Sequence, residues 1–160
     1  MEIIRKFKVY LDTSVISYLS QDDTPEKMKE TLDFWDAVKT GLFDVFISTA
    51  VIEEINKCPN PKRGFMLERL SEIDYVEIKV SQEVNAIARQ IIDEGILPPK
   101  ARFDSFHIAA AIAAGCHYIA SWNMKHMANV KTNRDMRLLT IKGGFAEISI
   151  VTPAMFNKGE

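Results

Sequence analysis

The sequence predicts an α/β protein in which a central, mainly parallel sheet lies between two layers of helices, a three-layer α/β/α sandwich. Short apolar segments of strand length alternate along the chain with longer segments of helical periodicity. This is the order that parallel strands and their crossover helices produce. The strand segments are short and mainly apolar, which is typical of strands covered on both faces.

Composition is that of an ordinary globular protein. No Ser/Gly/Pro-rich linker or repeat divides the 160 residues, so residues 1–160 are expected to form one domain. The net charge of −2 shows no overall basic character of the kind that announces a nucleic-acid partner. Two scattered cysteines, Cys58 and Cys116, are too few for a disulfide framework or a zinc site and indicate a reducing cytosol.

Membrane association and export are not expected. The longest apolar run, around residues 108–120, is too short to span a bilayer. The first twelve residues lack the apolar core and the cleavage site of a signal peptide. These features predict a cytoplasmic protein.

Strands and helices alternate in the first half of the chain. Phe7–Leu11 is a compact apolar segment that predicts a strand, and Thr13 and Ser14 are expected to cap a short helix that runs to about residue 19. Pro25 suits the first turn of a second helix, which Gly41 closes. The other elements expected here are a strand at 43–47, a helix capped by Ser48 or Thr49, a helix at 62–71 and a strand at 75–80.

The second half continues the alternation. Ser81 is expected to begin a helix that runs to about residue 94, and a loop with two prolines follows at 95–100. Residues 102–114 favour a helix that Gly115 stops, and 117–121 predict a strand that returns toward the edge where this helix begins. The last expected elements are a helical turn at 124–129, a helix or loop at 134–141 and a strand at 147–151.

Oxygen-bearing side chains gather at the carboxyl ends of the predicted strands, where parallel α/β sheets bind ligands. Asp12 ends the first strand and Asn123 follows the fourth, while Asp104 lies in the first turn of its helix. In the helix after the second strand, Glu53 lies opposite the apolar face and is expected to be solvated, whereas Glu54 lies on its flank. The candidate site residues are therefore Asp12, Glu54, Asp104 and Asn123.

Each of these residues also has a purely structural interpretation. Asp12 and Asn123 are residue types that cap helices and turns, and Asp104 favours the dipole at a helix N-terminus. His107, one turn after Asp104, is more often a packed, hydrogen-bonded histidine than a ligand. If the carboxylates do cluster without a Cys/His ligand set, they favour Mg²⁺ or Mn²⁺ over zinc, because a cation offsets their mutual repulsion.

Three segments resemble the PIN domain family, in particular the VapC-type toxins of bacteria and archaea. They are VYLDTSVIS at 9–17, ISTAVIEEI at 47–55 and ARFDSFHIAAAIAAGCHYIASWN at 101–123. The tail that follows is similar to a PIN subgroup that carries Asn-x-Lys-His after the fourth strand, here residues 123–126. The resemblance spans nearly the whole chain.

The resemblance implies a metal-dependent ribonuclease that acts on single strands, the toxin of a type II toxin–antitoxin pair. Its cofactor would be Mg²⁺ or Mn²⁺, and its partners would be RNA, an antitoxin protein and a second copy of the chain in a homodimer. The acidic tetrad would be carried by Asp12, Glu54, Asp104 and, at the fourth position, Asn123. Thr13 and Ser121 would support the acids by hydrogen bonding.

Asn123 departs from the commonest family pattern, because an amide brings no charge. Its oxygen can still bind Mg²⁺ or hold a metal-bound water, so Asn123 is also a candidate metal ligand. Three formal negatives predict weaker metal binding than four would, so the alternative is a catalytically weak PIN-fold module that binds RNA or a protein. A basic stretch follows Asn123, and it either follows an RNA backbone or forms an ordinary solvated surface. Its members are Lys125, His126, Lys131, Arg134 and Arg137.

Overall fold

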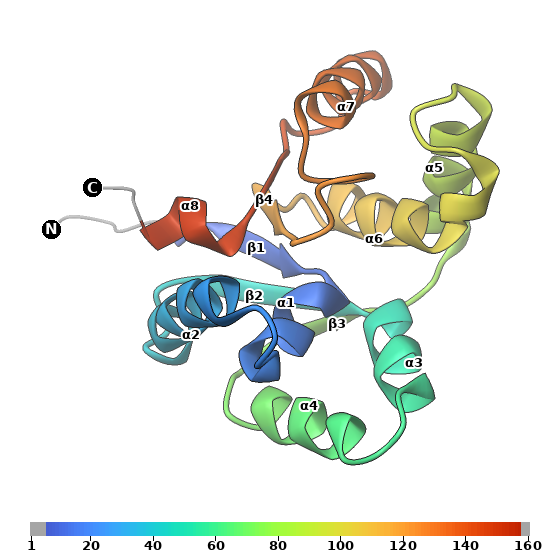
Figure 1. Ribbon diagram of the computed structural model, residues 1–160. Helices are drawn as coiled ribbons and strands as arrows, with labels where there is room; N and C mark the ends of the chain where they lie inside the picture. The colour runs from blue at the N-terminus through green and yellow to red at the C-terminus, as the bar shows by residue number, and fades with distance from the viewer. Residues whose placement is uncertain (1–5, 158–160) are drawn as a thin grey trace, which may run out of the picture.

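The computed structural model describes residues 6–157, and in this range five strands form an all-parallel sheet in the order β3-β2-β1-β4-β5 (Figure 1). Strand β1 (Lys8–Leu11) is central, with Val9 opposite Val45 of β2 and Tyr118 of β4. The other strands are β2 (Asp44–Ser48), β3 (Val76–Ile78), β4 (Tyr118–Ala120) and β5 (Ser149–Val151).

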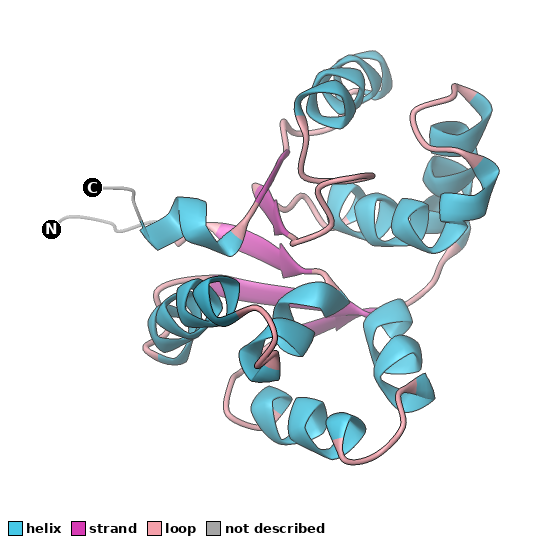
Figure 2. Cartoon of the chain, viewed as in Figure 1, coloured by secondary structure: helices cyan, strands magenta, loops and turns pink. Residues whose placement is uncertain are grey.

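Helices cover both faces of this sheet, which confirms the predicted three-layer α/β/α architecture (Figures 1 and 2). Helices α5, α6 and α7 lie on one side, α1, α2 and α4 lie on the other, and α3 leaves the carboxyl end of β2. Their bounds are α1 (Thr13–Ser17), α2 (Pro25–Lys39), α3 (Thr49–Lys57), α4 (Lys62–Leu70), α5 (Gln82–Asp93), α6 (Arg102–Ala113), α7 (Val130–Gly143) and α8 (Pro153–Asn157), with 3₁₀ turns η1 (Tyr18–Ser20) and η2 (Pro99–Ala101). No helix within residues 6–157 is both long enough and apolar enough to cross a membrane.

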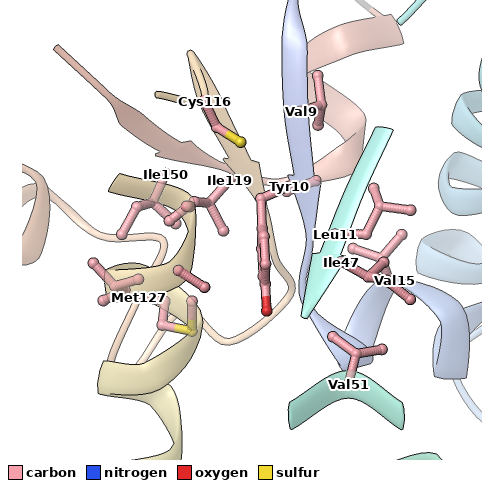
Figure 3. Close-up of a cluster of buried hydrophobic side chains, with 14 of the residues drawn as sticks. Val9, Tyr10, Leu11, Val15, Ile47, Val51, Cys116, Ile119, Met127 and Ile150 are labelled. Atoms are coloured by element: carbon pink, nitrogen blue, oxygen red, sulfur yellow. The ribbon is translucent and has the colours of Figure 1, made fainter. Parts of the chain in front are cut away.

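The core is built around β1, whose apolar sequence is buried on both faces. Val9, Tyr10 and Leu11 are each fully buried. Figure 3 shows Val9 and Leu11 on one side of the strand, with Leu11 near Ile47, and Tyr10 on the other. Burying a side chain of this size stabilises a fold by about 1.5–3 kcal/mol. The apolar run Val9–Leu11 is thus explained by two covered faces of β1 rather than one.

The predicted strands and the longer predicted helices are present with ends shifted by two residues or fewer, but three local predictions differ from the structure. Thr13 and Ser14 lie inside α1, and Asp12 takes the N-cap position instead. The Asp12 side chain makes no cap hydrogen bond, because other partners occupy its carboxylate. The loop predicted at 95–100 ends in the 3₁₀ turn η2.

The third difference lies after β4. Residues 124–129 form a hydrogen-bonded turn rather than a helical turn, and the amides of Met127 and Ala128 both donate to the carbonyl of Asn123. The segment predicted as helix or loop belongs to the longer helix α7, which Asn129 caps by accepting from the Thr132 amide. The structure also contains helix α8, which was not predicted from the sequence. It packs on α2, and the ring centroids of Phe156 and Phe34 are 4.9 Å apart.

Asn133 of α7 closes the outer edge of β5. Its Nδ2 donates to the carbonyl of Ile150 at 2.9 Å, and its Oδ1 accepts from the Ile150 amide at 2.7 Å. A side-chain amide therefore pairs the backbone groups that β5 would otherwise leave open, as a neighbouring strand would.

We expect Asn133→Ala to lower the free energy of unfolding by about 1–3 kcal/mol, because both backbone groups of Ile150 lose their partners. Urea unfolding measures this change. The matched control is Asn85→Ala, since Asn85 is also the fourth residue of its helix, α5, but is exposed. Both variants gain the same helix propensity, so equal changes in stability would contradict the role given to Asn133.

Candidate active site

Asp12 is the most enclosed acid at the carboxyl edge of the sheet. It follows β1 directly, its amide donates to the carbonyl of Ala120 at the end of β4, and it is 5% exposed. Its Oδ2 accepts hydrogen bonds from Ser14 at 2.7 Å and from Ser121 at 2.8 Å. The expected support of an acid by Ser121 is present, and Ser14 adds a second donor from α1.

Glu54 reaches the same place from α3. The helix turns Glu53 to solvent and leaves Glu54 half-buried, as the helical wheel predicts. Thr13 donates to Glu54 Oε1 at 2.9 Å, so the other expected supporting hydrogen bond is also present.

His107 of α6 lies between these two acids. It is fully buried, its Nε2 is hydrogen-bonded to Glu54 Oε1, and the same nitrogen lies 3.4 Å from Asp12 Oδ1. On its other side, Nδ1 is 2.7 Å from the hydroxyl of Tyr10, which is in turn 2.7 Å from the hydroxyl of Ser48. The prediction of a packed, hydrogen-bonded histidine is correct, but its partners place it at the centre of the site.

Asp104 forms a second cluster one turn before His107 on α6. Its Oδ2 accepts from Asn123 Nδ2 at 3.1 Å and lies 3.3 Å from His126 Nδ1. Asn123 Oδ1 in turn accepts from the His126 amide at 3.1 Å. Both ends of the Asn123 amide are therefore engaged within the protein, one by an acid and one by the turn after β4.

The pKa directions follow from crowding of negative charge. Burial favours neutral Glu54, but its hydrogen bond with His107, the charge of His107 and the hydrogen bond from Thr13 together outweigh it and lower the pKa of Glu54. Burial also disfavours charged His107, yet Asp12, Glu54 and Asp104 together raise its pKa. The pKa of Asp104 is raised by burial and then by the charge of Asp12.

These groups have the chemistry of a cation site. Ligand atoms of Asp12, Glu54 and His107 all lie within 4.8 Å of one another. Within this cluster of three residues, His107 is the one group that can balance the negative charge of Asp12 and Glu54. Asp104 adds a further carboxylate nearby. An oxygen-rich set with one imidazole can hold a divalent cation.

Sequence reasoning did not assign Tyr10 or Ser14 to the site and did not place His107 at its centre. The three-residue spacing of Asp104 and His107 on one helix was the available signal for His107. Tyr10 carried no such signal, because its two neighbours in the strand, Val9 and Leu11, are apolar and buried like itself.

The basic stretch after Asn123 is spread over a turn and a helix, and one of its members, His126, contacts an acid of the site. Lys131 pairs with Asp135 at 2.8 Å, and Arg137 lies 3.7 Å from Glu147. Lys125 and Arg134 are exposed.

Comparison with known proteins identifies a family and a similar fold. A model of the PIN domain family matches residues 9–125. No curated protein sequence matches the chain. Among solved structures, a chain of VapBC2 from Rickettsia felis, in a crystal structure with a DNA fragment from their promoter, has a TM-score of 0.59 and 12% identity. The match covers 91% of this chain and 98% of that chain, and at this identity it is a likeness of fold.

The raised pKa of Asp104 predicts that this acid destabilises the metal-free protein near neutral pH. Well below the unfolded pKa of an aspartate, about 3.9, the carboxyl is protonated in both states, so it has no such effect there. The effect appears as pH rises through the unfolded pKa and is complete above the folded pKa. We therefore expect Asp104→Asn to raise the free energy of unfolding at pH 7, measured in chelator, and the gain to shrink toward pH 4.

The control for this experiment is Asp74→Asn, because Asp74 is exposed and remote from the site. A loss of stability in Asp104→Asn that is the same at both pH values would show that the carboxylate is favourably placed in the metal-free fold.

Proposed function

The chain belongs to the PIN domain family, and we propose that it is a metal-dependent endoribonuclease, the toxin of a type II toxin–antitoxin pair. One observation carries the proposal. Asp12, which follows β1 directly, and Glu54, on the helix that follows β2, converge on one buried histidine, and Asp104 lies one helical turn away. The family match spans all of these residues and Asn123.

We propose Mg²⁺ or Mn²⁺ as the cofactor, held by Asp12, Glu54 and Asp104 directly or through water. A bound ion of this kind stabilises charge on a phosphoryl group and lowers the pKa of water. Ser14 and Ser121 both donate to Oδ2 of Asp12, which fixes the direction of that carboxylate.

The two remaining acids are also oriented by hydrogen bonds. Thr13 and His107 both bind Oε1 of Glu54, and within residues 6–157 no side-chain hydrogen bond engages Oε2. Asn123 orients Asp104 through Nδ2. We assign catalytic roles to Asp12, Glu54 and Asp104, and supporting roles to Thr13, Ser121 and Asn123.

The proposed substrate is single-stranded RNA in the cytoplasm, and residues 1–160 would act as one PIN-like domain. The basic stretch from Lys125 to Arg137 would follow the RNA backbone. We also propose an antitoxin protein as partner and a homodimer as the working form. The similarity in fold to a chain of a VapBC2 complex supports the antitoxin partner.

A catalytically weak module that binds RNA or a protein is the second candidate, and Asn123 is the reason for it. This residue brings no charge, and its oxygen accepts from the His126 amide instead of facing the acids. A cation would then be held by three formal negatives.

The direct test is cleavage of single-stranded RNA with Mg²⁺ or Mn²⁺. We expect the chain to cleave, chelator to abolish cleavage, and Asp104→Asn to reduce kcat by about 100-fold or more, because an anion that binds the cation is lost. Asp74→Asn should match the wild type. Since Asp104→Asn is expected to be more stable than the wild type at pH 7, unfolding would not explain its loss. Cleavage that persists in chelator or in Asp104→Asn would contradict the mechanism.

Calorimetric titration separates the two candidates. We expect Mn²⁺ to bind the wild type and to bind Asp104→Asn more weakly, because one of the carboxylates at the site is removed. If the wild type shows no metal binding at millimolar Mg²⁺ or Mn²⁺ but retains affinity for RNA, the chain is a binding module and not a nuclease.

A further inference from the structure

A large aromatic side chain lies exposed at the edge of the candidate active site. Phe103 immediately precedes Asp104 on α6 and is 45% exposed. The amino group of Lys57, at the end of α3, lies over its ring at 4.9 Å from the centroid. Lys57 is itself exposed, so this cation and this ring meet at the protein surface.

The position of this pair follows from the helical repeat. Lys57 is three residues after Glu54 on α3, and Phe103 is four residues before His107 on α6, so each pair of residues shares one helix face. The contact between Lys57 and Phe103 therefore lies beside the contact between Glu54 and His107, one helical turn away along α3 and α6. One turn of helix is about 5 Å.

We propose that Phe103 is a stacking platform for one unpaired base of the substrate, and that Lys57 binds an adjacent phosphate. This inference rests on the proposed function and deepens it, because it assigns a subsite for single-stranded RNA. A strand whose phosphate lies against Asp12 and Glu54 must continue across the neighbouring surface, and on the α3–α6 side that surface is the ring of Phe103 and the ammonium of Lys57.

The chemistry of the pair suits a nucleotide better than a purely apolar partner. An exposed aromatic ring stacks on the face of any base, and a lysine beside it supplies the charge that a phosphate requires. Duplex RNA does not offer this contact, because its bases are already stacked and paired. The subsite therefore selects unpaired RNA without selecting a particular base.

Binding is measured on the intact chain in chelator, so that no cleavage occurs and the readout does not depend on catalysis. The probe is a single-stranded RNA that carries 2-aminopurine, whose fluorescence reports stacking. We expect Phe103→Leu to raise Kd about tenfold and to remove the fluorescence change, and Phe103→Trp to preserve both. Lys57→Gln should weaken binding and reduce the salt dependence of log K by about 0.7, the value for one phosphate contact on a single strand.

The matched control is Phe65→Leu, because Phe65 of α4 is 50% exposed and is not part of the site. It should bind like the wild type. The effect of Phe103→Leu should be absent on a duplex of the same sequence.

Three results would overturn the proposal. They are equal Kd values for Phe103→Leu and Phe65→Leu, no measurable RNA binding by the wild type, or a change in self-association of Phe103→Leu with its RNA binding intact. The last would make Phe103 a protein contact. If the chain binds RNA through Phe103 but never cleaves it, the proposed nuclease fails while this subsite stands. If the chain cleaves RNA and Phe103→Leu binds RNA like the wild type, the proposed nuclease stands while this subsite fails.

Discussion

The buried carboxylate of Asp12 imposes the main constraint on this structure. An ionised acid that is 5% exposed is costly unless hydrogen bonds and a countercharge compensate it. Here the compensation comes from Ser14 on α1, Ser121 after β4 and His107 on α6. His107 in turn binds Glu54 of α3. Satisfying one acid thus ties together the strand that carries it and the helices that surround it.

The same constraint explains why the site suits a cation. Glu54 keeps a lowered pKa because His107 and Thr13 stabilise its charge, whereas Asp104, half-buried and near Asp12, has a raised one. Negative charge at the site is thus greater than the surrounding hydrogen bonds can offset. Groups that destabilise the metal-free fold are those that gain most when a divalent ion binds, since a ligand that prefers the folded state stabilises it.

Asn123 acquires a definite place in this arrangement. An acid at this position would repel Asp104, while the amide donates to Asp104 and accepts from the His126 backbone. The amide therefore couples the orientation of Asp104 to the turn that leads into α7. We interpret Asn123 as a positioning residue, which distinguishes its proposed role from that of a fourth charged ligand.

Much of the fold and part of the site follow from sequence periodicity alone. Apolar strand segments that alternate with helical segments favour a parallel sheet, and the carboxyl ends of parallel strands meet at one edge, which places Asp12 and Asn123 at that edge. The helical repeat also predicts that Glu54 faces the site while Glu53 faces solvent.

Tertiary structure decided which side chains from distant parts of the chain contact one another. Whether His107 faces apolar core or two acids depends on how α6 packs against β1 and α3. Ser14 has two partners, the carboxylate of Asp12 and the amide of Trp122, and these come together only when β1 pairs with β4. The contacts of His107 with the two acids, and of Ser14 with the Trp122 amide, join residues about 50 to 110 positions apart. Local sequence patterns therefore determine which side chains are available, and long-range packing determines which of them meet.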